Sequence, residues 1–579
     1  MPPANEPLFT SEGRSSIHSE ERAAQEDDAL LGNQRRRSNT TRGVFWREIG
    51  LFTWAILATV AVIVLAILLK CQPSQNKPEK HTGKRNLVFM VSDGMGPASL
   101  SLTRSFRQYQ NGLPIDDVLV LDEHFIGSSR TRSSNSLVTD SAAGATAFSC
   151  GKKSYNGAIS ILPDHTPCGT VLEAAKRAGY MTGLVVTTSL TDATPACFAS
   201  HANIRSEEDL IAQQEVGHYP LGRVVDLMFG GGRCHFLPNT TSGSCRADNQ
   251  DITKLAQDEY GWNYIDNRQD FDDIKAGGAA VKLPLLGLFA DYNIPFEIDR
   301  RNMDDVYPSL EEMAQVALKA LEAATQDSDK GFFLMIEGSR IDHAGHGNDP
   351  AAQVHEVMAY DRAFGSVVEF LEKSHVDGVL VATSDHETGG LATARQLDAH
   401  YPEYLWYPGV LANVSSSAEY LARRLNSEID SNLLEGDKLK NWINEEFVKN
   451  GLGILDASDD ELQLIIDQPK VSAYYFADMV SRRAQIGWST HGHSAVDVNI
   501  YGTAGSSNLR GNHENTNVGE FLREYLDVDV DAVTKELIKG SKSFNIADTE
   551  EAGWTGRIPS EEDLQSVLRY HEELYGKAP

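Results

Sequence analysis

The sequence of 579 residues has few basic side chains for its length, and it contains no internal repeat. Its 52 Lys and Arg residues stand against 82 Asp and Glu residues, which leaves a formal net charge of −30. Nucleic-acid-binding proteins need a basic surface, so this excess of negative charge excludes nucleic acid as a partner. Acidic side chains can instead serve to bind cations. Hydrophobic residues make up 41% of the chain, enough for a sizeable core in one large domain with insertions.

Residues 49–69 carry no charged side chain at all. As a helix this run would be about 31 Å long, which is enough to span a bilayer. It is too long, and too far from Met1, for a cleaved signal peptide. More arginines precede it than lysines follow it, which weakly favours a cytosolic N-terminus. We therefore expect a single-pass type II membrane protein with the chain after Lys70 on the lumenal side.

Two glycosylation acceptors fit this topology. Asn239 and Asn413 each begin an Asn-x-Ser/Thr sequence, which is modified only on the non-cytosolic side of a membrane. The segment Glu26-Asp27-Asp28-Ala29-Leu30-Leu31 in the cytosolic part resembles an acidic dileucine signal that binds a sorting adaptor. These features favour a glycoprotein that is sorted between membrane compartments.

The six cysteines allow two disulfides in the lumenal part. Cys234 and Cys245 bracket a short polar loop, which is typical of a disulfide in an oxidising compartment. Cys150 and Cys168 could form a second pair and would leave Cys197 free. Buried thiols remain the alternative, because pairing does not follow from sequence alone.

Composition divides the chain into segments. Residues 1–48 are polar, with little to bury, and we expect a disordered tail there. Residues 70–85 follow the apolar run as a linker. We expect the main domain over residues 86–540, with an inserted helical subdomain at 391–487, and a flexible tail over 541–579.

Short apolar strands alternate with helices through the main domain. This alternation predicts an α/β fold whose large, mostly parallel sheet has helices on both faces, with functional sites at the carboxyl ends of the strands. The predicted strands are residues 87–91, 182–188, 332–336, 378–383 and 496–500. The predicted helices include residues 171–178, the run that begins after Ser309, and residues 357–371, with 418–429, 438–448 and 473–484 in the insert.

Ser141 begins a run of small, helix-compatible residues. Thr139 or Asp140 can cap a helix there, which would place the Ser141 hydroxyl in the first turn. Unpaired backbone N–H groups and the positive end of the helix dipole would then favour an alkoxide, or a phosphate esterified to the serine.

Potential metal ligands follow three predicted strands and precede the last one. Mixed carboxylates and imidazoles suit zinc, whereas an all-oxygen site suits magnesium. Asp342 and His346 have the spacing that places both side chains on one face of a helical turn. The residues concerned are Asp93, Glu337, Asp342, His346, Asp385, His386, His491 and His493.

These motifs, in this order, resemble those of the alkaline phosphatase family. The resemblance covers roughly residues 86–526, and the layout is similar to that of membrane-anchored fungal members. It implies hydrolysis of a broad range of small phosphate monoesters through a phosphoserine intermediate on Ser141. It also implies an alkaline phosphatase-like sheet, a crown-like insert, a homodimer and a place in the vacuole membrane.

The resemblance further implies two Zn²⁺ and one Mg²⁺ per subunit. The implied ligands are Asp342, His346 and His491 for one zinc, Asp385, His386 and Asp93 for the other, and Asp93, Thr194 and Glu337 for magnesium. Arg205, thirteen residues after Asp192, matches the phosphate-binding arginine, whose planar fork holds two phosphoryl oxygens.

Local spacing does not choose between His491 and His493. Aligning residues 496–502 with the corresponding strand of the family favours His491, and His493 stays a rival beside the metals. Asp140, Asp192 and His343 are expected to flank the metals without binding them.

A sulfatase, a phosphodiesterase and a non-catalytic membrane protein are the alternatives to a phosphomonoesterase. A sulfatase would need a cysteine at the position of Ser141, and a phosphodiesterase would not need the magnesium ligands. A non-catalytic type II membrane protein would be expected to have lost ligands, and none is missing.

Overall fold

The computed structural model describes residues 41–71, 83–277, 281–429, 434–540, 553–560 and 562–563. It divides the chain into two units, residues 1–80 and 81–579, which are described separately. The expected sorting signal at Glu26–Leu31 and most of the two expected tails lie outside the described residues.

The first unit contains one long helix, α2 (Thr41–Cys71). Residues Trp46–Ile63 within it are long and apolar enough to cross a membrane. Its large apolar side chains are exposed, with Leu51 64%, Phe52 73% and Trp54 70% accessible. The helix is longer at both ends than the uncharged run, because extending an existing helix costs little. The helix contains the whole predicted span of residues 49–69, and the boundaries of the tail at residue 48 and of the linker at residue 70 stay predictions.

The second unit is built on a ten-stranded sheet in the order β12-β2-β11-β8-β1-β7-β3-β4-β6-β5. All neighbouring strands are parallel except where β11 pairs with β2 and β8, so the predicted mostly parallel sheet is confirmed. The strands are β1 (Arg85–Val91), β2 (Phe125–Arg130), β3 (Met181–Ser189), β4 (Leu227–Gly231), β5 (Asn263–Ile265), β6 (Leu285–Leu288), β7 (Phe332–Glu337), β8 (Asp377–Thr383), β11 (Val498–Gly502) and β12 (Gly511–Glu514).

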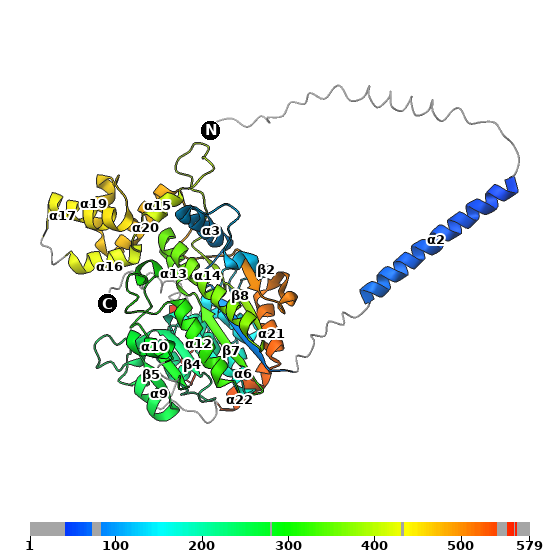
Figure 1. Cartoon of the computed structure of the whole chain (residues 1–579), viewed down its shortest axis with the longest axis horizontal. Coiled ribbons are helices and arrows are strands. Elements are labelled where there is room, and N and C mark those ends of the chain that lie inside the picture. Colours follow the sequence, from blue (N-terminus) through cyan, green and yellow to red (C-terminus); the bar gives the residue numbers. More distant parts are fainter. Residues whose placement is uncertain are drawn as a thin grey trace, which may run out of the picture. The chain divides into compact units, whose positions relative to one another are not determined.

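Helices cover both faces of this sheet (Figure 1). Alternate side chains of β1 point to opposite faces: Leu87 and Phe89 join one buried cluster, and Val88 and Met90 join another. The first cluster includes residues of α6, α21 and α22, and the second includes residues of α12 and α14. The helices from α3 to α14 are α3 (Pro97–Asn111), α4 (Val120–Glu123), α5 (Ser141–Cys150), α6 (Val171–Arg177), α7 (Ala193–Ala199), α8 (Glu208–Val216), α9 (Ile252–Tyr260), α10 (Arg268–Lys275), α11 (Glu297–Arg300), α12 (Leu310–Ala324), α13 (Arg340–His346) and α14 (Pro350–Lys373), and the last two are α21 (Asn515–Leu526) and α22 (Val530–Gly540).

The inserted region folds as a group of helices, yellow in Figure 1, near α3. Its apolar side chains form a third buried cluster, which also takes in Leu102 and Phe106 of α3. The predicted helical character of this region is confirmed, although its boundaries at 391 and 487 stay a prediction. Its helices are α15 (Pro408–Ala412), α16 (Ala418–Glu428), α17 (Gly436–Ile443), α18 (Asn450–Leu452), α19 (Asp459–Asp467) and α20 (Ser472–Ala484).

Both candidate disulfides are present. Cys150 is bonded to Cys168 and Cys234 to Cys245. Cys197 is a buried free thiol, and burial raises its pKa to about 12. This thiol therefore stays protonated and unreactive.

Part of the expected C-terminal tail is packed against the rest of the second unit. Trp554 is buried, and its ring lies against those of His201 and Tyr219, with centroid distances of 5.6 and 6.3 Å. The backbone carbonyl of Thr555 accepts a hydrogen bond from the Asn203 N–H at 2.9 Å. Residues 554–556 are thus packed in place by one buried aromatic side chain and its neighbouring hydrogen bonds, while the flexibility of the rest of the tail stays a prediction.

We expect Trp554→Ala to destabilise the protein by about 3–5 kcal/mol, because it leaves a cavity where a large buried ring stood. Urea unfolding followed by tryptophan fluorescence and circular dichroism measures this loss. Tyr404→Ala is a suitable control, since that ring is 85% exposed. Equal unfolding midpoints for Trp554→Ala and wild type would contradict the docking of this segment.

Candidate active site

Four adjacent parallel strands, β8, β1, β7 and β3, end at one edge of the sheet. Asp93 lies just beyond β1, Glu337 is the last residue of β7, and Asp385 lies just beyond β8. Thr194 is in α7, which begins shortly after β3. The carboxyl ends of parallel strands therefore bring together side chains that are far apart in sequence.

Ser141 is the first residue of α5, whose ten residues are all buried. Asp140 caps this helix: its Oδ1 accepts a hydrogen bond from the Ala143 N–H at 3.0 Å. The Ser141 hydroxyl oxygen lies 3.1 Å from His386 Nε2. Gly144 allows the helix to approach Asp385, because a Cβ at this position would lie 2.9 Å from the Asp385 Cβ. The predicted helix start is confirmed, with Asp140 rather than Thr139 as the cap.

One candidate metal cluster contains Asp93, Asp385 and His386, all buried beside Ser141. His386 Nε2 lies 3.2 Å from Asp385 Oδ2 and 3.5 Å from Asp93 Oδ1. Asp93 Oδ1 and Asp385 Oδ2 are buried and have no hydrogen-bond partner. Buried carboxylate oxygens without a donor are costly, so their convergence with an imidazole nitrogen fits a bound cation.

A second cluster contains Asp342, His346 and His493. His346 Nε2 lies 3.1 Å from His493 Nε2 and 3.3 Å from Asp342 Oδ2. Two nitrogens bound to one tetrahedral zinc would lie roughly 3.3 Å apart, so this spacing fits a shared zinc ion. His493 Nδ1 donates to the Thr139 carbonyl at 2.8 Å, which turns Nε2 toward the cluster.

The sequence favours His491 for this cluster and keeps His493 as a rival, and the geometry brings His493, not His491, together with Asp342 and His346. His491 is exposed, and its Nδ1 lies 2.8 Å from the His346 carbonyl oxygen, outside the cluster. His493 begins the short strand β10 (His493–Ser494), which pairs with β9 (Glu387–Thr388) next to His386. The last predicted strand begins two residues too early, at 496 instead of 498.

Asp93, Thr194 and Glu337 form a third, oxygen-rich group. Thr194 Oγ1 donates to Asp93 Oδ2 at 3.4 Å. Burial, together with the neighbouring carboxylates Asp385 and Asp342, raises the pKa of Asp93 well above its usual value. Burial also raises the pKa of Glu337, to about 8. Because crowded carboxylates resist ionisation in the absence of counter-charge, this donor set fits a hard divalent cation.

Arg205 is held beside these groups by two carboxylates. Its Nη2 donates to Asp192 Oδ1 at 2.8 Å, and its Nη1 lies 3.5 Å from Asp140 Oδ2. Burial opposes the charge of Arg205, but Asp192 and Asp140 outweigh it and raise the pKa further above its usual range. The guanidinium therefore stays charged and fixed close to Ser141, where it can bind an anion.

Comparison with known proteins agrees with this geometry. The family model described as "Alkaline phosphatase" matches residues 84–528. The chain belongs to the alkaline phosphatase family. It is 56% identical over 511 residues to the repressible alkaline phosphatase of Saccharomyces cerevisiae, covering 85% of this chain and 88% of that one.

Solved alkaline phosphatases share the fold. That of Thermus thermophilus has a TM-score of 0.65 and 27% identity, covering 86% of this chain and 97% of its own. A variant of the TAB5 alkaline phosphatase, from an Antarctic bacterium, was solved with magnesium in its M3 site. It has a TM-score of 0.53 and 25% identity, covering 77% of this chain and 99% of its own.

One residue of this candidate active site, Thr388, is not among those expected from the sequence. Thr388 Oγ1 donates to Asp342 Oδ1 and lies 3.2 Å from His386 Nδ1, so it bridges the two candidate zinc clusters. Only its position directly after Asp385-His386-Glu387 indicates a role in the site, and a threonine at such a position is equally typical of an ordinary strand.

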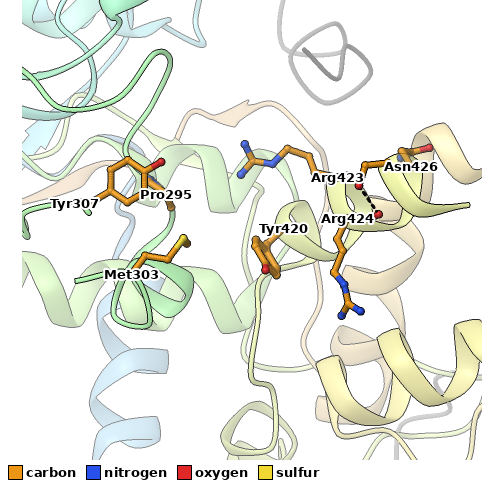
Figure 2. Close-up of a pocket in the computed structure, with 8 residues that line it drawn as sticks. Pro295, Met303, Tyr307, Tyr420, Arg423, Arg424 and Asn426 are labelled. Carbon is orange, nitrogen blue, oxygen red and sulfur yellow. Dashed lines mark hydrogen bonds between the residues drawn. The ribbon is translucent and has the colours of Figure 1, made fainter. Parts of the chain in front are cut away.

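A separate cavity of about 580 Å³ lies away from the alkaline phosphatase centre (Figure 2). Pro295, Met303 and Tyr307 line one side, and Tyr420, Arg423 and other residues of α16 line the other. Its arginines already pair with Glu419, Glu428 and Glu446. This cavity therefore has no excess positive charge for a phosphate ester.

Proposed function

We propose that this phosphatase transfers the phosphoryl group of a monoester to Ser141 and then to water. The observation that carries the proposal is the Ser141 hydroxyl at the start of α5, 3.1 Å from His386 and beside two convergent metal-type clusters. Membership of the alkaline phosphatase family supports phosphate monoesters as the substrate class.

In the first step, Ser141 Oγ attacks phosphorus, and the bond from phosphorus to the alcohol oxygen of the ester breaks. Arg205 binds two non-bridging phosphoryl oxygens, because Asp192 and Asp140 hold its planar fork in place. The N–H groups at the start of α5 face the same negative charge. In the second step, water attacks the phosphoserine and releases inorganic phosphate.

We propose two Zn²⁺ and one Mg²⁺ per subunit. The zinc ligands would be Asp93, Asp385 and His386 in one site and Asp342, His346 and His493 in the other, with magnesium held by Asp93, Thr194 and Glu337. When bound, these cations would lower the pKa of coordinated oxygens and neutralise charge on the phosphoryl group. Because the proposed contacts of Arg205, the start of α5 and the cations are all with the phosphoryl group, the enzyme should accept monoesters of many alcohols.

The alternatives are less well supported. Ser141 occupies the position where a sulfatase needs a cysteine. A diesterase would not need Thr194 and Glu337 near Asp93. A non-catalytic protein would have no reason to keep buried, unpartnered carboxylate oxygens, which cost free energy unless a ligand uses them.

Dialysis against EDTA should abolish hydrolysis of a chromogenic phosphate monoester, and zinc with magnesium should restore it. Metal analysis should give two zinc ions and one magnesium ion per active chain. The sulfate and diester analogues, tested in parallel, should be hydrolysed far more slowly. Full activity after verified metal removal would contradict the proposal, as would faster hydrolysis of either analogue.

We further propose a type II topology with the catalytic domain, residues 86–540, in the lumen of the vacuole. The apolar helix α2 supports a membrane anchor, and the two disulfides fit an oxidising compartment. Asn239 and Asn413 are both exposed, which leaves both accessible to glycosylation. Resemblance to membrane-anchored fungal relatives supports the vacuole, a homodimer and recognition of Glu26–Leu31 by a sorting adaptor.

A further inference from the structure

The inserted helices contact the active site through a buried ion pair. Glu419, in the first turn of α16, accepts a hydrogen bond from Arg340 Nη2 at 2.6 Å. Arg340 is the first residue of α13, the helix that carries Asp342 and His346. The Arg340 side chain is only 3% exposed and that of Glu419 17%, so solvent screens this pair weakly.

The Arg340 side chain makes further contacts besides its ion pair with Glu419. Its Nη1 donates to the Ile294 carbonyl at 3.1 Å, and its guanidinium lies 3.7 Å from the centre of the Phe296 ring. Its Nε donates to His343 Nδ1 at 3.3 Å. A guanidinium fixed by Glu419 in this way also fixes the position of the His343 ring.

The contacts continue from His343 to the phosphate-binding arginine. Because Nδ1 of His343 accepts a hydrogen bond, its hydrogen is on Nε2. That Nε2 lies 3.9 Å from Asp192 Oδ2, a packing contact too long for a hydrogen bond, and Asp192 Oδ1 accepts from Arg205 Nη2 at 2.8 Å. Five side chains thus connect α16 of the insert to the guanidinium that faces the substrate: Glu419, Arg340, His343, Asp192 and Arg205.

We propose that Glu419 is a positioning residue for phosphate binding. Its charge holds Arg340 against His343, and His343 limits how far Asp192 can turn, so the fork of Arg205 stays aimed at the phosphoryl oxygens. This gives the insert a role in the reaction. The inference rests on the proposed function, and in particular on Arg205 as the phosphate ligand.

The surroundings of Glu419 make this ion pair separable from the packing of the insert. Arg423, on the same helix, also pairs with Glu419 at 2.6 Å, but Arg423 and Tyr420 face the cavity in Figure 2 and not a packed interface. The start of α16 is anchored independently, because the Ala418 N–H donates to Asp349 at 2.8 Å and the Ser417 N–H to Asp299 at 3.0 Å. Removing the charge of Glu419 should therefore leave the insert docked.

The test is Glu419→Gln in the metal-loaded, full-length enzyme. Glutamine keeps the size and one acceptor oxygen but loses the charge. We expect KM for a chromogenic monoester and the inhibition constant of inorganic phosphate to rise together, by about threefold to tenfold, with a smaller change in kcat. Glu428→Gln is the matched control: it removes an ion pair with Arg424 on the same helix, and both constants should stay at the wild-type values.

A second experiment distinguishes positioning of Arg205 through His343 from a general loss of packing around Glu419. In a His343→Ala background the link is already broken, so Glu419→Gln should add no further rise in either constant. Wild-type phosphate inhibition in Glu419→Gln, or the same proportional rise with and without His343, would overturn the inference. If Glu419→Gln does not fold, Glu419→Asp replaces it, because aspartate keeps the charge but has a shorter side chain. We then expect a smaller rise in KM and in the inhibition constant of phosphate. Wild-type values of both constants in Glu419→Asp would also overturn the inference. An inactive wild-type enzyme would instead refute the proposed function.

Discussion

Ser141→Ala should lower kcat for phosphate monoesters by roughly 10⁴- to 10⁶-fold, because the reaction loses its nucleophile while the binding groups remain. Rapid mixing with a chromogenic substrate should show no burst of alcohol release. Acid quenching with ³²P-labelled substrate should trap no phosphoenzyme. The zinc and magnesium content should be unchanged, because Ser141 belongs to neither candidate zinc cluster.

Ser149→Ala is the matched control for this experiment. Ser149 lies on the same buried helix, but its hydroxyl contacts Ser160 and not the metal clusters. That variant should keep the burst and most of the turnover. A full burst in Ser141→Ala would refute the assignment of the nucleophile, and loss of metal from Ser141→Ala would mean that its inactivity has another cause.

His493→Ala should weaken binding of one zinc by at least about 100-fold, because the variant removes one of the three ligands proposed for that site. Activity should fall accordingly and recover in part at high zinc concentration. Metal analysis after dialysis against a weak chelator, and activity titrated against free zinc, measure the two effects.

His491→Ala provides the natural comparison, two residues away. Its exposed ring contacts the backbone carbonyl of His346 and not the His346 imidazole, so zinc binding and turnover should stay close to wild type. The reverse result, with metal lost from His491→Ala and kept by His493→Ala, would restore the sequence-based assignment and contradict the arrangement of β9 and β10.

The sequence predicted the five central strands of the ten-stranded sheet, β11, β8, β1, β7 and β3, because most of them contain continuous apolar runs, and it did not predict the five outer ones. Residues 87–91 and 332–336 lie within β1 and β7, and their neighbours Asp93 and Glu337 meet at the sheet edge as expected. The capping box of Ser309 with Glu312 is present at the start of α12. Such features depend on local residue chemistry, which a single sequence contains in full.

The remaining features depend on contacts between distant segments. The choice of His493 over His491 follows from pairing with β9, more than a hundred residues away in sequence. The buried Trp554 and the pair of Glu419 with Arg340 likewise join segments that no spacing rule connects. A polar tail and an acidic helix start look the same in sequence whether or not they dock.

The complete burial of α5 constrains how substrate preference could diversify. Any larger side chain in this helix would press on Asp385 or on the surrounding core, since none of its ten residues faces solvent. Directed evolution toward new esters would therefore find few viable mutants in α5. Library positions are better placed around the exposed His491 and the half-buried Tyr474, which belong to neither candidate zinc cluster.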